Sequence, residues 1–185
     1  MDQPASKPTT DSSKRCWDWM IVSGNCHYAK NRSMFRSYRR APGKIAGNRV
    51  LGVGRVELQV QRAPEDTRTN TLVLQDVLHM PNAPCNGLSI NKYRDANPGL
   101  DVEGDGEEHV QAVSDEDREP LWYGDDYHRM ARVVLAGEPR GESYLEEESD
   151  DGEDGGTRRR RLSVSASENE LDRLEKRLRD GDWGF

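Results

Sequence analysis

One stretch of the sequence, residues 55–81, limits the fold more than any other. In R-V-E-L-Q-V, apolar and polar side chains alternate, which is the period of a half-buried β-strand. The apolar members are Val56, Leu58 and Val60. The polar residues 63–70 then predict a hairpin-type loop, and residues 71–80 predict a second strand that ends at Pro81. Because two strands alone are marginally stable, the rest of the sheet must come from other parts of the chain.

Shorter apolar segments on both sides of this pair can supply the remaining strands. Residues 16–22, C-W-D-W-M-I-V, form an apolar, aromatic run suited to a buried strand. The acidic residues 99–119 predict a surface loop, within which residues 109–113 form a weak strand. Two further strands are predicted at residues 121–123 and 130–136. The chain is therefore predicted to be mainly β, with one domain over residues 16–137.

The low content of large apolar side chains predicts that this domain is flanked by disordered tails. Leu, Ile, Val and Phe make up about 17% of the chain, below the roughly 20% at which highly charged chains tend toward disorder. We expect a disordered tail over residues 1–15 and a disordered linker, acidic and then basic, over residues 138–166. The first hundred residues are net basic and the remainder is net acidic.

A short amphipathic helix is predicted over residues 167–180. Ser167 and Glu170 fit a capping box, and Gly181 can end the helix. An apolar stripe is formed by Leu171, Leu174 and Leu178. A helix of this length is marginal alone, so it either docks on the domain or forms only in part.

Several classes of protein are not expected. No window approaches 18 apolar residues, and the N-terminal residues contain no apolar stretch of a secretory signal, so we expect neither a membrane span nor secretion. Three cysteines are too few for a disulfide framework, which favours reduced thiols in the cytoplasm or nucleus. No nucleotide-binding or cofactor-binding motif is recognised, and no cofactor is expected.

Five segments in order resemble a known family. They are W-D-W-M-I-V-S-G-N-C-H-Y, Phe35, V-L-G-V-G-R-V-E-L, Q-D-V-L-H-M-P and N-G-L-S-I. The set, best over residues 17–90, resembles the aspartic-protease-like domain of copia-type retrotransposon Pol polyproteins. The resemblance implies a small retropepsin-like β-barrel over residues 16–137. It also implies a homodimer, because the active form of that family pairs two copies.

The same resemblance implies that catalysis is lost. The catalytic Asp of the family precedes Ser-Gly, and here Val22 precedes Ser23 and Gly24. We expect an inactive interaction module with an unknown protein partner, or a remnant of a retrotransposon. The alternative is a residual aspartic endopeptidase. The candidate substitute carboxylates for it are Asp11, Asp18 and Asp76, and Asp18 is the one that a peptidase would use.

Two glycines in the third segment match the family's flap or a nearby bend. Gly52 and Gly54 fit a mobile flap over a cleft, but the usual role of glycine in a strand, a bulge or a tight turn, is favoured.

A second candidate set is Cys26, His27, His79 and Cys85. Their spacing matches no known zinc site, so buried thiols and ordinary histidines are favoured and no metal is expected.

A basic and aromatic stretch over residues 28–49 offers the alternative of a nucleic-acid-binding module. Its candidate contacts are Lys30, Arg32, Phe35, Arg36, Tyr38, Arg39 and Arg40. A solvated segment whose Phe35 and Tyr38 pack on the sheet is favoured over this alternative, because the acidic half lowers any attraction for nucleic acid.

The arginines at 158–161 precede Leu162 and Ser163. This pattern resembles a basophilic kinase site at Ser163 and a nuclear localisation patch, but a charged linker is favoured over both.

Overall fold

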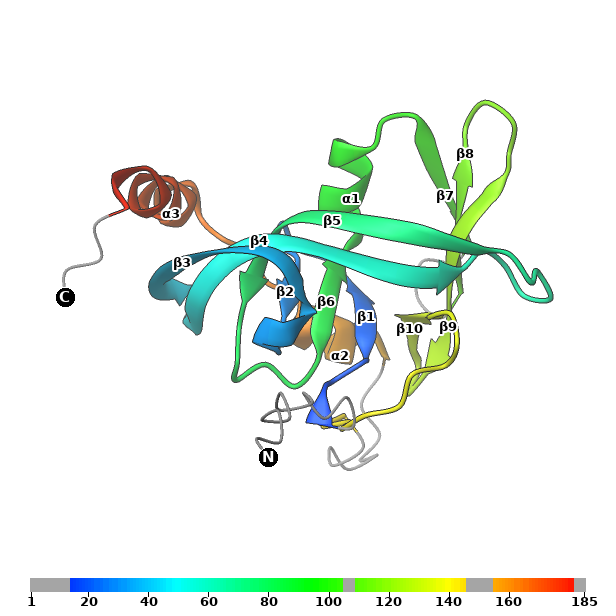
Figure 1. Ribbon diagram of the computed structural model, residues 1–185, viewed down its shortest axis with the longest axis horizontal. Helices are drawn as coiled ribbons and strands as arrows, with labels where there is room; N and C mark the ends of the chain where they lie inside the picture. The colour runs from blue at the N-terminus through cyan, green and yellow to red at the C-terminus, as the bar shows by residue number, and fades with distance from the viewer. Residues whose placement is uncertain (1–13, 105–108, 146–154, 182–185) are drawn as a thin grey trace, which may run out of the picture.

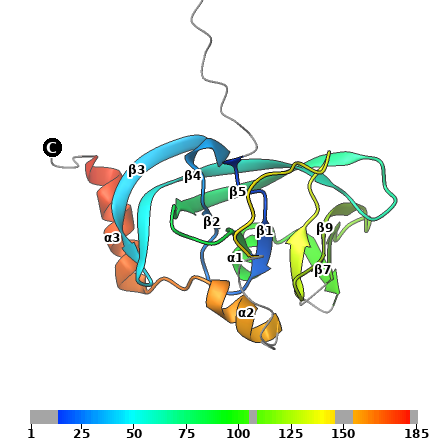
Figure 2. The same cartoon turned by 90° about the horizontal axis from the view of Figure 1, so that it is seen from below.

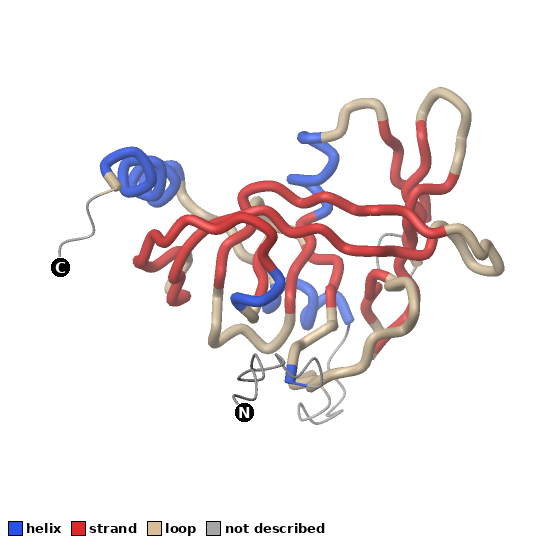
Figure 3. Tube along the Cα trace, in the orientation of Figure 1, coloured by secondary structure: helices blue, strands red, loops and turns tan. Residues whose placement is uncertain are grey.

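The computed structural model of the protein describes residues 14–104, 109–145 and 155–181. These residues form one ten-stranded sheet in the order β3-β4-β5-β2-β6-β1-β10-β9-β8-β7 (Figure 1). The predicted mainly β class is confirmed, as Figure 3 shows by the predominance of strand. The sheet is not closed, because β3 and β7 lie at its two ends and do not pair with each other.

The elements follow one another along the chain as a run of short strands, a long meander and a second group of strands. The strands are β1 (Trp19–Val22), β2 (Tyr28–Ala29), β3 (Phe35–Ile45), β4 (Asn48–Gln61), β5 (Thr69–His79), β6 (Asn86–Ser89), β7 (Leu100–Gly104), β8 (Val110–Ser114), β9 (Pro120–Tyr127) and β10 (Met130–Val133). The helices are the 3₁₀ turn η2 (Arg32–Met34), α1 (Ile90–Ala96), α2 (Gly155–Leu162) and α3 (Glu168–Asp180).

The strand β1 lies between two apolar cores. Side chains alternate along a strand, so Trp19 and Ile21 enter one core while Met20 and Val22 enter the other. All four side chains are buried, which explains why the run shows no alternation in sequence. The strand pairs in parallel with β6 and antiparallel with β10. The predicted buried strand is confirmed.

The predicted pair of alternating strands is present as β4 and β5. Val56 lies opposite Leu74 and Leu58 opposite Leu72. The structure adds β3, which pairs with β4 through a tight turn at Ala46 and Gly47. Both turn residues have positive φ, as the preferred two-residue hairpin turns require. The segment expected to be solvated is therefore a strand of eleven residues.

The predicted acidic surface loop over residues 99–119 is wrong at residues 100–104, which form β7, whereas the weak strand predicted at residues 109–113 is confirmed as β8. β7 and β8 pair with each other, and β8 also pairs with β9. The acidic side chains of Asp101 and Glu103 lie exposed on β7, the last strand of the sheet. An edge strand tolerates such charges, and they hide its period in the sequence. The strands predicted near residues 121–123 and 130–136 are confirmed as β9 and β10.

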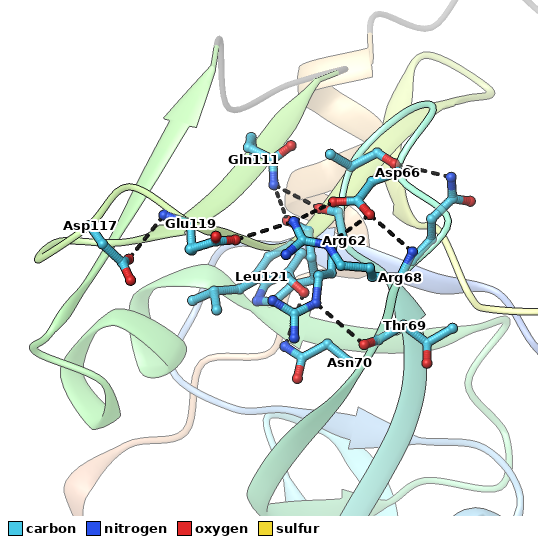
Figure 4. Close-up of polar contacts among 12 residues, drawn as sticks. Arg62, Asp66, Arg68, Thr69, Asn70, Gln111, Asp117, Glu119 and Leu121 are labelled. Carbon is cyan, nitrogen blue, oxygen red and sulfur yellow. Dashed lines mark hydrogen bonds and ion pairs between the residues drawn. The ribbon is translucent and has the colours of Figure 1, made fainter.

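A polar cluster joins the β4–β5 loop to the β8–β9 hairpin (Figure 4). The Arg68 guanidinium contacts Asp66 at 2.9 Å and Glu119 at 3.2 Å. The side-chain amide nitrogen Nε2 of Gln111 donates to the backbone carbonyls of Arg62 at 2.9 Å and Trp122 at 2.8 Å. Hydrogen bonds from Arg68 lower the pKa of Asp66 to about 2. The loop is thereby held against the second half of the sheet.

The chain beyond residue 137 is not a disordered linker where the structure describes it. α2 begins at Gly155 and packs near β1 and β10. Buried side chains after residue 137 are Leu145, Leu162, Val164, Ala166 and Leu174. They complete the second core, so the core does not end at residue 137. Residues 1–13 and 146–154 lie outside the described part, and so does nearly all of the predicted N-terminal tail.

The predicted C-terminal helix is confirmed as α3, with Ser167 as its N-cap and a complete capping box with Glu170. It docks beside β3, as Figures 1 and 2 both show. Leu174 is buried against the second core, and the Glu170 carboxylate accepts from the Ala46 amide at 2.7 Å. Of the described helices, none is long and apolar enough to cross a membrane.

Candidate functional site

The residues Val22, Ser23 and Gly24, named here the Val-Ser-Gly turn, leave the end of β1. Val22 is fully buried in the second core and lies opposite Ser89 of β6. Gly24 has a φ of +87°, a conformation that side chains rarely adopt. The turn thus presents backbone groups and the Ser23 hydroxyl, while the side chain at position 22 points into the apolar interior.

The start of α1 holds this turn in place. The Ser89 hydroxyl donates to the Gly24 carbonyl at 2.9 Å and accepts from the Lys92 amide at 3.2 Å. The Ser89 amide donates to Nδ1 of His27 at 2.9 Å. Burial lowers the pKa of His27 to about 3, so its ring is a neutral acceptor at physiological pH.

The carboxylates considered as substitutes do not meet at the Val-Ser-Gly turn. Asp18 is buried, and its oxygens contact the Arg132 guanidinium at 2.9 Å and the Ser143 hydroxyl at 2.6 Å. Asp76 is exposed on β5 at a positive φ of 52°. Asp11 lies outside the described residues. Asp18 is thus engaged as a structural ion pair with the neighbouring strand β10.

A segment from the far end of the chain lies along the turn. We name residues 162–166, L-S-V-S-A, the strap. Val164 forms a parallel bridge with Gly24, and its carbonyl accepts from the Asn25 amide at 3.1 Å. The Ser163 hydroxyl lies 2.9 Å from the Ser23 amide and 2.8 Å from the Ser23 hydroxyl.

Two more contacts hold the ends of the strap. The Tyr28 hydroxyl donates to the Leu162 carbonyl at 2.6 Å. The Asn25 side chain both donates to the Ala166 carbonyl at 2.9 Å and accepts from the Ala166 amide at 2.8 Å. Every residue of the chain from 23 to 25 therefore contacts the strap. The Val-Ser-Gly turn and Asn25 thus bind the short segment that joins α2 to α3, with one β-bridge at Val164.

Glycine is required where the strap crosses the turn. A Cβ on Gly24 would lie 2.4 Å from the Val164 carbonyl oxygen, far closer than real contacts allow. Together with the positive φ, this close approach explains the glycine after Ser23 without any reference to catalysis.

Gly52 and Gly54 lie in the middle of β4 and not at the tip of the β3–β4 hairpin, which is Ala46–Gly47. A Cβ at Gly52 would meet the ring of Tyr38, and a Cβ at Gly54 would meet the Ser37 carbonyl oxygen. A register shift between β4 and β5 follows Gly54. The favoured interpretation of these glycines as a bulge or tight turn fits their positions within β4.

The members of the cysteine and histidine set have separate partners. His27 accepts from Ser89, His79 contacts the Tyr38 hydroxyl at 2.9 Å, and Cys85 lies 3.6 Å from the Tyr28 hydroxyl. Cys26 is buried, and burial raises the pKa of its thiol. Across the three described ranges, no group of three or more His, Cys, Asp or Glu side chains is arranged to hold a metal ion.

The basic and aromatic residues are spread over several contacts. Lys30 donates to the carbonyls of Pro81 and Ala83, both at 2.9 Å. Arg32 covers the ring of Tyr38 at 3.9 Å. Phe35 is buried in the first core and so offers no open ring face to a base.

Three arginines on β3 are exposed. Arg36 pairs with Glu57 at 3.0 Å, and Arg39 donates to the Leu178 carbonyl of α3. Arg40 is the third. These arginines thus lie exposed on β3, whereas the ring of Phe35 at the start of that strand is buried.

The strap is the part of the site that the sequence analysis missed. Its signal is the alternation of Leu162, Val164 and Ala166, which are buried, with Ser163 and Ser165. Leu162 is the last residue of α2 and Val164 forms a single β-bridge, so the alternation marks which side chains enter the second core. The arginine run before them and the serines between them made the segment look like a solvated linker.

No family model matches the sequence, and neither the curated proteins nor the solved structures contain a match to it.

Proposed function

We propose that this chain is a catalytically inactive relative of the copia-type aspartic-protease-like domain, and that it acts as an interaction module for extended peptide segments. The observation that carries the proposal is Val22, fully buried at the position that the resemblance gives to the catalytic Asp. The two residues after it contact the strap through backbone and hydroxyl groups, with one β-bridge between Gly24 and Val164.

The chemistry of aspartic proteases explains why Val22 matters. Two carboxylates share a proton and activate a water molecule. Valine has no lone pair and no titratable proton, so it can neither orient nor deprotonate water. The buried carboxylate of Asp18 is engaged with the Arg132 guanidinium and the Ser143 hydroxyl, away from the Val-Ser-Gly turn.

The chemistry of the partner follows from the strap. Backbone pairing with an added strand supplies affinity, and pockets for alternate side chains supply specificity. Here Leu162, Val164 and Ala166 are buried while Ser165 is exposed. The preferred partner is thus an extended segment with apolar side chains at alternate positions and small polar residues between them.

One assay tests binding and inactivity together. A fluorescent peptide with the sequence of residues 159–168 is added to the full chain carrying Leu162→Asp and Val164→Asp, which keep the strap out of the apolar core. We expect saturable binding by anisotropy and an intact peptide by mass spectrometry. The wild type should bind less, because its own strap competes at a high effective concentration. The control peptide carries the same two Asp substitutions and should not bind.

A pair of variants at position 22 tests the loss of catalysis. The wild type should leave the peptide intact between about pH 4 and pH 7, the range in which a shared-proton pair works. Val22→Asp is compared with Val22→Asn, because asparagine is polar and of the same size as aspartate but cannot ionise. Cleavage by Val22→Asp alone would support the resemblance. Cleavage by the wild type would contradict the inactive assignment, and absence of peptide binding would contradict the module.

A further inference from the structure

The Ser163 hydroxyl uses its full hydrogen-bonding capacity in the strap. It donates to the Arg159 carbonyl at 2.7 Å, accepts from the Ser23 amide at 2.9 Å and contacts the Ser23 hydroxyl at 2.8 Å. A serine hydroxyl has one proton and two lone pairs, so these three contacts leave no spare position. The contact between the strap and the turn depends on this oxygen staying a free hydroxyl.

The sequence before Ser163 is strongly basic. Four arginines occupy positions 158–161, and two of them lie three and two residues before the serine. Charge patterns of this kind are what serine kinases use to choose substrates. We propose that Ser163 is a regulatory phosphorylation site, and that its phosphorylation by a basophilic, ATP-dependent kinase releases the strap from the Val-Ser-Gly turn. This inference does not depend on whether the domain binds peptides in trans.

The modification is an ordinary phosphoryl transfer. The Ser163 oxygen attacks the γ-phosphorus of ATP, so an O–P bond forms while the bond from the γ-phosphorus to the β,γ-bridging oxygen breaks. The hydroxyl proton passes to the catalytic base of the kinase, and ADP leaves with the electron pair of the broken bond.

The phosphorylated side chain does not fit the closed site. The ester oxygen has lost the proton that it donated to the Arg159 carbonyl. Three further oxygens with a charge of about −1.5 to −2 would enter a half-buried space that the Ser23 amide, the Ser23 hydroxyl and the Arg159 carbonyl already border. The negative charge would lie against the Arg159 carbonyl oxygen and has no room between the strap and Ser23, so the closed contact is disrupted.

The released state has its own stabilisation. The phosphate would lie four residues after Arg159 and three after Arg160, the spacings at which side chains meet on a helix. Arginine binds phosphate through two parallel hydrogen bonds. The end of α2 can therefore hold the modified serine once the strap has left the turn.

Ser165 provides a matched comparison two residues further on. It is exposed, whereas its neighbours Val164 and Ala166 are buried. A negative charge at position 165 makes the strap more acidic, as phosphorylation of Ser163 does, but it leaves the contacts between Ser163 and Ser23 in place.

The strap must open before a kinase can reach Ser163. Asn25 holds it closed by its two hydrogen bonds with Ala166. Linkage requires that a change which favours the open strap also favours phosphorylation. Asn25→Ala should therefore raise the rate of Ser163 phosphorylation about tenfold, since two hydrogen bonds of ordinary strength are lost.

The test uses the full chain, a purified basophilic serine kinase and MgATP. The site of modification is determined by tandem mass spectrometry, and amide exchange is followed by NMR at Ser23 and Asn25. Phosphorylation at Ser163 should accelerate exchange at both amides by about tenfold or more. Ser163→Ala should accelerate exchange at Ser23 only, because the Asn25 amide bonds the Val164 carbonyl. Ser165→Glu should change neither.

Three results would overturn the proposal. If Ser163 stays unmodified even in the Asn25→Ala chain, it is not a phosphorylation site. If Ser163 is modified while the Asn25 amide stays protected, phosphorylation does not release the strap. Ser165→Glu could accelerate exchange as much as phosphorylated Ser163, which would assign the effect to charge alone.

Discussion

Gly24 combines two constraints, a positive φ and the nearby carbonyl of Val164. Gly24→Ala should lower the free energy of unfolding by about 1–3 kcal/mol from backbone strain, and it should also push the strap away. Gly47 is the matched control, because it has a φ of +78° and no atom near its Cβ position. Urea unfolding should show a loss of stability in both variants, but only Gly24→Ala should lose protection of the Asn25 amide. Retained protection in Gly24→Ala would contradict the close approach.

His27 makes the folded state sensitive to acid. Burial lowers its folded pKa to about 3, below the unfolded value near 6.5, so the unfolded chain binds a proton that the folded chain does not. This contribution to stability is fully present above about pH 6.5 and is lost as the pH falls toward 3, by about 1.4 kcal/mol per pH unit. The pKa of His79 is also lowered by burial, so it acts in the same direction.

The pH prediction is tested by urea unfolding of wild type and His27→Gln between about pH 4 and pH 8. Glutamine can still accept from the Ser89 amide but cannot titrate. The variant should lose most of the slope below pH 6.5, while His79→Gln should lose less. An unchanged slope in His27→Gln would mean that another group controls acid unfolding.

Among the secondary structure elements, α3 depends on docking. It has thirteen residues, and helices this short are marginal alone. Leu174 is buried, whereas Leu171 and Leu178 are only partly buried. Leu174→Ala should cost about 2–5 kcal/mol, more than Leu171→Ala. Thermal unfolding followed by circular dichroism measures the difference, and equal losses would mean that the helix does not use Leu174 as its anchor.

The predictability of each element follows from where its side chains lie. β4 and β5 were predicted because one face of each strand is buried and the other is exposed to solvent, so apolar side chains recur with a period of two. The capping box and leucine stripe likewise identified α3. β3 was missed because arginines occupy most of its exposed positions, and β7 because it carries acidic residues at the edge of the sheet.

Across the whole chain, sequence reasoning located one half of the candidate site. The Val-Ser-Gly turn was singled out through the resemblance, and the replacement of a catalytic carboxylate by Val22 stays a prediction. The strap was not assigned to the turn, because Ser23 and Ser163 are 140 positions apart and no local pattern encodes their pairing. The apolar residues of the C-terminal segments also complete the second core. A domain limited to residues 16–137 therefore lacks part of the apolar side chains of that core.

The distance in sequence between the turn and the strap also has a consequence during synthesis. A ribosome adds about 5–20 residues per second, so the turn waits on the order of ten seconds for its partner. In that interval the sheet can assemble, but the amides of Ser23 and Asn25 have no strap to bond. A nascent chain at this stage offers a strand-pairing site to its neighbours on the same messenger RNA. The last turn of α2 and the residues after it therefore cover this pairing site only at the end of synthesis. A holding chaperone would be most useful just before the strap emerges from the ribosome.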